Sequence, residues 1–300
     1  MRKKGLLKAE WKGLIYVLIG AICFSTKAIL VKFTYRYGID AITSLCLRML
    51  FAFPFYTAML WYSCNKAKLR EVSAKQWSLV LCMGIVGYYM ASMFDFAGLK
   101  YISASLERLI VFLYPTLVVI ISAFFLSKKI KRNVWWAMFI SYLGIVIVFS
   151  GDTYQQQGNL WLGVFLVFMS SFTYAIYLIG TGELVHKLGT LFYTSLAMLI
   201  SCVIVFIHFF VFHDFSLLFS LPKVLYVYGF LMGVLATVVP SFFISEGIKL
   251  LGSSKASVVS SIGPVFTILL AIVFLNETFS LIHALGTLLV IAGVVKVSRG

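Results

Sequence analysis

The chain alternates between long apolar stretches and short polar connections that gather most of its charged residues. Ten of the stretches approach the length of about 20 helical residues that crosses roughly 30 Å of hydrocarbon. They extend over residues 13–31, 42–62, 77–97, 104–126, 134–150, 160–180, 190–212, 224–244, 256–275 and 282–297. Runs such as Leu196 to Phe212 lack the apolar–polar alternation of strands in membrane barrels. The pattern therefore predicts an all-α integral membrane protein with ten transmembrane helices.

The composition excludes an ordinary soluble domain. The 300 residues are 62% hydrophobic and 12% charged, and the mean hydropathy is +1.02. Soluble domains carry about twice that charged fraction, because charged side chains cover their surface. Most soluble enzymes are excluded for the same reason, and the bilayer itself is the predicted surrounding.

The basic residues predict the orientation. Eighteen of the 25 Lys and Arg residues lie at the two termini and in alternate connections, four lie in the intervening connections, and three lie within spans. Cytoplasmic connections carry the excess of Lys and Arg, so both termini are predicted to face the cytoplasm, with the chain as a multi-pass protein of the cytoplasmic (inner) membrane. The net charge of +15 is thus a topology signal, and no nucleic-acid partner is predicted.

The second half of the chain repeats the first. An offset of 149 residues aligns Gly98 with Gly247, Lys100 with Lys249, Ser105 with Ser254, Pro115 with Pro264, Gly144 with Gly293 and Gly151 with Gly300. We predict two five-helix units, residues 1–151 and 152–300. Because five is odd, the second unit enters the membrane from the opposite side, and such inverted repeats are typical of transporters that work by alternating access. The alternative is a duplication that only enlarged the bundle.

Two segments carry a family resemblance. The run from Gly98 to Pro115 and its counterpart from Gly247 through Pro264 to Glu277 resemble the EamA-type repeat of the drug/metabolite transporter superfamily, as does Arg48 in the second span. The resemblance implies ten helices, transport of small metabolites, and a central cavity built from the first, third and fourth helices of each half. At the position of Glu277 in the second half, the first half has Lys128. The sequence therefore does not support gating by an equivalent acidic residue in both halves.

Charged residues inside the spans are the first candidates for a substrate site, because each is costly in a bilayer without a partner or a function. They are Lys27, Arg48, Asp95, Glu107 and Arg108. Arg48 is interpreted mainly as structural and the other four as substrate-binding candidates, with helix capping or a pair with Lys100 as an equal alternative for Asp95. For Arg108 two roles stay open: binding an anionic or carboxylate-bearing solute, or an ion pair with Glu107 or Asp95 that orders the bundle. Glu107 is expected to pair with Lys27 or Arg48.

Polar and aromatic positions extend the candidate site. Ser257 and Ser261 align with Arg108 and Phe112 and form a polar stripe in the ninth span, although small-residue helix packing explains serines equally well. Pro115 and Pro264 are predicted to kink the fourth and ninth spans as hinges or as fixed bends. Of the tyrosines within spans, Tyr89, Tyr114 and Tyr174 are predicted to form amphipathic walls of the cavity.

No residue pattern predicts catalysis. The chain has no HExxH, GxSxG or phosphate-loop motif, its histidines lack ligand spacing, and its five cysteines form no CxxC pair. We expect no metal, no cofactor and no enzyme activity. The sequence favours a secondary transporter, an exporter or exchanger of small polar or amphipathic metabolites such as amino acids. An uptake permease and a lipid or lipid-linked sugar translocator are the alternatives, and proton or counter-solute coupling and a homodimer stay open.

Overall fold

A computed structural model describes residues 2–63, 73–126, 132–152, 159–252, 256, 259–260, 262–278 and 280–299. Every regular element in these ranges is a helix. The first half contains α1 (Arg2–Ser25), α2 (Lys27–Tyr35), α3 (Ala41–Ser63), α5 (Ala74–Cys82), the π-helix η1 (Met83–Met90), α6 (Ala91–Leu99), α7 (Ala104–Val111), α8 (Tyr114–Leu126) and α9 (Arg132–Asp152).

The second half repeats this order. It contains α10 (Leu160–Leu188), α11 (Thr190–Phe212), the short α12 (Leu217–Ser220), α13 (Lys223–Gly233), η2 (Val234–Val238), α14 (Val239–Leu251), α16 (Ile262–Leu270), η3 (Ala271–Leu275) and α17 (Leu281–Arg299). The single helix α10 takes the place of the α1–α2 pair, and the α13–η2–α14 series takes the place of α5–η1–α6.

The helices account for the apolar stretches of the sequence. Within the described residues, seven helical stretches are long and apolar enough to cross a membrane. Three shorter apolar helices, Trp135–Ser150, Ile262–Leu275 and Leu281–Lys296, coincide with the remaining predicted spans. The prediction of an all-α membrane protein is therefore confirmed, and ten crossings stay a prediction.

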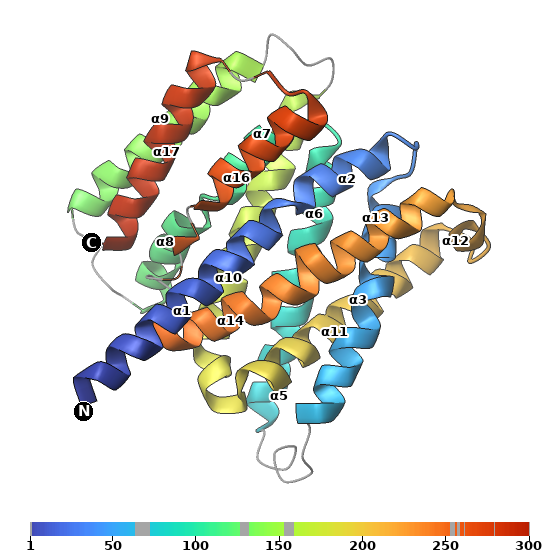
Figure 1. Ribbon diagram of the computed structural model, residues 1–300, viewed down its shortest axis with the longest axis horizontal. Helices are drawn as coiled ribbons and strands as arrows, with labels where there is room; N and C mark the ends of the chain where they lie inside the picture. Colours follow the sequence, from blue (N-terminus) through green and yellow to red (C-terminus); the bar gives the residue numbers. More distant parts are fainter. Residues whose placement is uncertain are drawn as a thin grey trace.

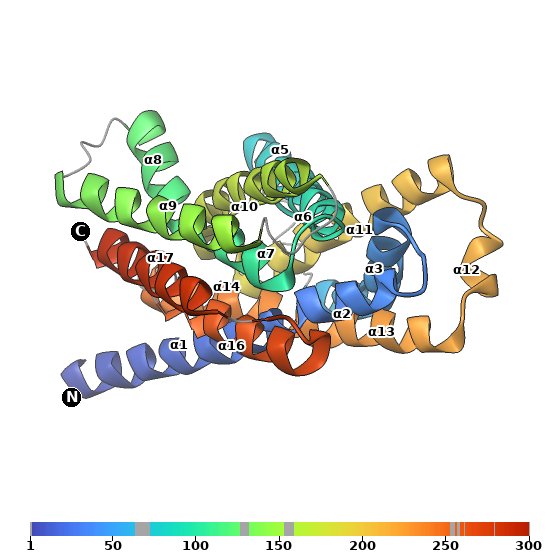
Figure 2. The same ribbon diagram turned by 90° about the horizontal axis from the view of Figure 1, so that it is seen from above.

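Helices from the two halves pack against each other in matching pairs. α1 packs on α14 and α6 packs on α10, while α3 contacts α11 and α7 contacts α16. α9 and α17 lie side by side along one end of the molecule, and α3 and α13 lie toward the other end (Figure 1). The turned view separates α1, α14 and α16 from the layer that holds α6, α7 and α10 (Figure 2).

Glycines make these pairings close. A Cβ placed on Gly98 would lie 3.0 Å from the carbonyl oxygen of Gly163, and one on Gly247 would lie 3.4 Å from that of Gly13. Both contacts join helices of opposite halves. Small residues let helix backbones approach in this way, which replaces the hydrophobic drive that is missing in lipid.

Several spans are interrupted rather than straight. The first breaks at Thr26, between α1 and α2, and the third contains η1. The fourth breaks at Phe112 and Leu113, so that Pro115 lies in the first turn of α8, and Pro264 likewise lies in the first turn of α16. The first turn tolerates proline because its backbone N–H groups have no acceptor within the helix. The predicted kink at Pro115 thus takes the form of a break just before it.

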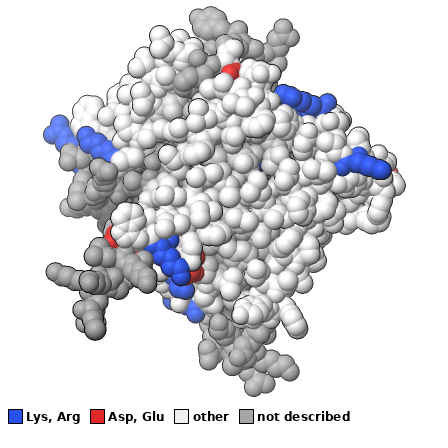
Figure 3. Space-filling view, in the orientation of Figure 1, with Lys and Arg blue, Asp and Glu red and all other residues white. Residues whose placement is uncertain are grey.

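The distribution of apolar and charged side chains is the reverse of that in a soluble protein. Large apolar side chains such as Trp61 and Phe124, 85% and 83% exposed, lie on the outside. The face in Figure 3 is mostly uncharged, with Lys and Arg near its margins. Five charged side chains lie in the interior, and they form the candidate site.

Candidate functional site

Five charged side chains of the first half are buried in the helix bundle. Their exposed fractions are 4% for Lys27, 2% for Arg48, 2% for Asp95, 0% for Glu107 and 6% for Arg108. They come from α2, α3, α6 and α7, four helices that are separate in the sequence. These are the five intramembrane charges that the sequence predicts, and the fold gathers them in one region.

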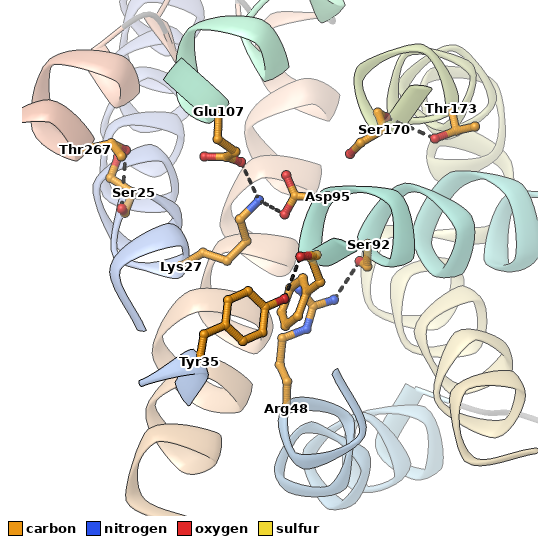
Figure 4. A network of polar contacts seen from close by, with 11 residues as sticks. Ser25, Lys27, Tyr35, Arg48, Ser92, Asp95, Glu107, Ser170, Thr173 and Thr267 are labelled. Atoms are coloured by element: carbon orange, nitrogen blue, oxygen red, sulfur yellow. Dashed lines mark hydrogen bonds and ion pairs between the residues drawn. The ribbon is translucent and has the colours of Figure 1, made fainter. Parts of the chain in front are cut away.

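Lys27 lies at the centre of the cluster and holds both acidic groups (Figure 4). Its Nζ is 2.6 Å from Oδ2 of Asp95 and 3.1 Å from Oε1 of Glu107. The same Nζ lies 4.9 Å from the centre of the Phe24 ring, a cation–π distance. Of the two partners predicted for Glu107, the structure therefore gives it Lys27.

The helix breaks place these groups. Lys27 is the first residue of α2, immediately after Thr26, whose hydroxyl bonds to the carbonyl of Cys23 at 2.8 Å. α7 begins beside the cluster, where the Ser103 hydroxyl accepts the Leu106 N–H at 3.1 Å. A π-helix has a wider turn than an α-helix, so η1 sets the rotation of α6 and of Asp95 on it.

Arg48 is held by contacts that explain it structurally. Its Nη2 donates to Oγ of Ser92 at 2.7 Å, and its guanidinium lies 4.9 Å from the centre of the Phe96 ring. Both partners are on the third span. Arg48 thereby ties α3 to α6, which fits the ordering role favoured by the sequence.

Arg108 has different surroundings. Its guanidinium lies 4.9 Å from the centre of the Phe24 ring and against Gly263, where an added Cβ would come within 2.5 Å of Nη2. Its Nε, like that of Arg48, is buried and has no hydrogen-bond partner among the described residues. Among the described residues no carboxylate lies within 4 Å of it, because Lys27 holds both Asp95 and Glu107.

Three small voids meet beside the cluster. Their volumes are about 30, 30 and 10 Å³, and Phe24 and Tyr174 line all three. Arg108 and Tyr114 line the first void, and Lys27, Asp95 and Ser92 line the second. The cluster is therefore divided by two aromatic rings rather than open as one cavity.

The remaining candidates lie in different places. The hydroxyl of Tyr89 is 2.9 Å from Nδ1 of His208 on α11, while its neighbour Tyr88 lines the second void. Ser257 and Ser261 lie outside the described residues, although Ser260 between them lines the first void. Sequence reasoning missed Phe24, whose one signal is its alignment with Tyr174 at the 150-residue offset that pairs Trp11 with Trp161.

A wider pocket of about 480 Å³ opens at the N-terminal end of α7. Its lining includes Lys32, Tyr35, Arg36, Ser103, Ser105, Glu277 and His283. Glu277 accepts the Ala104 N–H at 2.7 Å, the Ser105 N–H at 3.2 Å and the Ser105 hydroxyl at 2.6 Å. The segment after η3 is thereby fastened to the start of α7 by a carboxylate that caps the helix.

The described residues contain no group of three or more His, Cys, Asp or Glu side chains arranged to hold a metal ion. Cys23, Cys46, Cys82 and Cys202 are free thiols. The chemistry that the site offers is therefore ion pairing, hydrogen bonding and aromatic contact.

Comparison with known proteins gives one consistent answer. The model of the EamA-like transporter family matches residues 11–150 and again residues 161–299. The uncharacterized transporter YcbK of Bacillus subtilis (strain 168) is 28% identical over 280 residues, which are 91% of this chain and 88% of that protein. The uncharacterized transporter sll1319 of Synechocystis is 22% identical, over 93% of this chain and 90% of its own length. A solved structure entitled "Crystal structure of protein" shares the fold, with a TM-score of 0.69 at 16% identity and 95% of each chain covered.

Proposed function

The chain belongs to the EamA-like transporter family, and from that membership we propose that it is a secondary transporter of small polar or amphipathic metabolites such as amino acids. It works by alternating access as an exporter or exchanger in the cytoplasmic membrane, with both termini in the cytoplasm. The carrying observation is the cluster of five charged side chains, none more than 6% exposed, inside a bundle with an apolar exterior. Such burial is costly in a membrane, and charged residues that are retained there commonly belong to solute or ion pathways.

The pairing of the two halves supports alternating access. α1 with α14 and α6 with α10 are contacts that exchange when the halves exchange, as are α1 with α16 and α10 with α8. Two five-helix units, 1–151 and 152–300, related in this way can adopt opposite openings at similar energy. The break before Pro115 and the first turn of α16, which holds Pro264, would act as the hinges.

Different residues of the cluster are proposed to bind different parts of the solute. Arg108 offers a planar guanidinium with an unpartnered Nε to a carboxylate. Lys27, Asp95 and Glu107 supply charges of both signs, and Tyr114 and Tyr174 contact the apolar part of the solute. Ser257 and Ser261 are predicted to complete the polar wall, and Tyr89 is the candidate farthest from this arrangement because it contacts His208.

The test is counterflow in proteoliposomes containing the full chain. The liposomes are preloaded with one unlabelled solute from a panel of L-amino acids, nucleosides and sugars, and uptake of the radiolabelled form is followed. We expect exchange within one solute class and none in protein-free liposomes. A folded, reconstituted protein that exchanges none of the panel would contradict the proposal.

A further inference from the structure

Two carboxyl groups share one ammonium in the buried cluster. Asp95 and Glu107 both contact Nζ of Lys27, so their nearest oxygens are separated by no more than the sum of the two contact distances. Each carboxyl group therefore lies close to the charge of the other, and a proton on one of them removes the repulsion between the two.

No other described cation contacts the pair directly, and the guanidinium charges of Arg48 and Arg108 act on it from beyond ion-pair distance. Arg48 is directed to Ser92 and Phe96, and Arg108 to Phe24, and no described guanidinium forms an ion pair with either acid. Oδ1 of Asp95 and Oε2 of Glu107 are buried and accept no hydrogen bond from a described donor. The other titratable groups on the elements packed around the pair are Tyr35 on α2, Tyr88 on η1, and Tyr174 and Tyr177 on α10.

Two like charges this close in a buried site of low dielectric constant are strongly unfavourable. One ammonium balances one carboxylate, so a proton on the second carboxyl group makes the trio electrically neutral. Burial therefore favours binding of a proton as long as the cluster stays closed.

Each helix that carries the trio is interrupted nearby. Lys27 follows the break at Thr26, Asp95 follows η1, and Glu107 precedes the break at Phe112. π-Helices and helix breaks are places where a span bends. A rearrangement that opens the bundle at these points would separate the three groups and admit water.

We propose that the Asp95–Glu107 pair carries a proton through the transport cycle, and that this proton competes with the ammonium group of the solute. The inference rests on the proposed transport function and names its coupling ion and the charged groups of its solute. In the closed cluster the proton is held between the two carboxyl groups. On opening, the O–H bond breaks and the proton passes to water, which leaves a second carboxylate.

The solute's ammonium then pairs with this carboxylate, while the solute's own carboxylate binds Arg108. On the other side of the membrane the solute leaves, and a proton from water returns to the pair. Because proton and ammonium cannot occupy the same carboxylate together, the cycle exchanges an amino acid for a proton.

The proton is tested first without any solute. Difference infrared spectroscopy of the purified full chain across a pH series reports the carbonyl stretch of a buried protonated carboxyl group. We expect this band in the unmodified protein at neutral pH, and its loss in both Glu107→Gln and Asp95→Asn, since a single carboxylate beside Lys27 ionises. Glu246→Gln, which alters a more exposed carboxylate paired with Lys249, is the matched control and keeps the band. Absence of the band from the unmodified protein refutes the proposal.

The coupling is tested in proteoliposomes with radiolabelled L-leucine and L-phenylalanine. An imposed pH gradient is expected to drive accumulation by the unmodified protein and by Glu246→Gln, and not by Glu107→Gln. Counterflow that is indifferent to the pH gradient refutes the coupling and leaves the proposed transport function standing. A chain that exchanges no member of the wider panel refutes both.

Discussion

At the scale of single residues, Arg48 and Arg108 form an instructive pair. Both are buried arginines stacked on a phenylalanine ring, at 4.9 Å in each case. The Nε of each is buried without a hydrogen-bond partner among the described residues, and each side chain lines a void. They differ in that Nη2 of Arg48 donates to Ser92 at 2.7 Å, whereas the described contacts of Arg108 are with the Phe24 ring and Gly263. The proposed division of roles, with Arg48 ordering the bundle and Arg108 binding the solute, rests on this difference.

This contrast predicts opposite effects of the same substitution. Arg108→Lys should fold normally and raise the KM for solute about 10- to 100-fold, because a lysine cannot reproduce charge-assisted bidentate bonds. Arg48→Lys is the matched control and should lower the thermal unfolding temperature instead. Counterflow kinetics and thermal unfolding in detergent distinguish the two. An Arg108→Lys protein with unchanged KM would exclude the carboxylate-binding role.

The sequence predicts the charged residues of the site better than their surroundings. Lys27, Asp95 and Glu107 can be identified from the sequence because each is an ionisable residue within an apolar stretch, where a charge has a large energetic cost. Phe24 carries no such contrast, since it is one apolar residue among many. The pairing of Glu107 with Lys27 depends on how three separate helices are rotated, and local sequence does not encode that rotation.

At the scale of helices, the positions of the spans follow from apolar length, but their interruptions do not. η1 is a π-helix over Met83–Met90 in a run whose side chains are as apolar as those of the helices around it. Its extra residue per turn changes which of Tyr88 and Tyr89 faces the cluster. Sequence periodicity assumes a regular helix and therefore cannot select between the two tyrosines.

The cap on α7 leads to a prediction about stability. Glu277→Ala removes three hydrogen bonds to the start of α7 and should cost about 1–2 kcal/mol of unfolding free energy. Glu277→Gln keeps an acceptor oxygen and should cost less. Glu246→Ala, which breaks only an exposed pair with Lys249, should be nearly neutral. Thermal unfolding in detergent measures all three, and equal effects of the two alanine substitutions would argue against the cap.

The contact of α9 with α17 leads to a second prediction about stability. A Cβ on Gly144 would lie 2.6 Å from the carbonyl oxygen of Gly286 and 2.9 Å from the backbone N of Val290. Backbone cannot give way cheaply, so Gly144→Ala should lower the unfolding temperature. Gly182 on α10 has open space where its Cβ would be, so Gly182→Ala should be neutral or slightly stabilising. A stabilising Gly144→Ala would show that the two helices are not in close contact.

At the scale of the whole molecule, the distribution of basic residues predicts which ends face the cytoplasm. In a variant without native cysteines, Lys75→Cys should resist a membrane-impermeant maleimide applied to intact cells, whereas Lys223→Cys should react. Both residues are exposed. Permeabilised cells, in which both should react, provide the control. Labelling of Lys75→Cys from outside would show that the orientation is the reverse of the predicted one.

The two segments that the family model matches, residues 11–150 and 161–299, differ in their charges. At the 150-residue offset that pairs Trp11 with Trp161, Lys27 pairs with Tyr177, and at the 149-residue offset Arg108 pairs with Ser257 and Glu107 with Ala256. The repeat therefore predicts the shared helices. It does not predict the chemistry of the site, because the charged side chains all belong to one copy.

Because the buried charges belong to one half of the molecule, we expect its transport cycle to respond to membrane voltage. In the proposed alternating access, three basic and two acidic groups move with the helices of the first half, and the described residues of the second half hold no corresponding set of buried Lys, Arg, Asp or Glu side chains to cancel their displacement. Carrying one elementary charge through the whole membrane field changes the energy by about 2.3 kcal/mol per 100 mV, and a fractional displacement changes it in proportion. The step that rearranges the first half should therefore run at a voltage-dependent rate. On solid-supported membranes it should produce a transient current, and Lys27→Met should alter the size of that current.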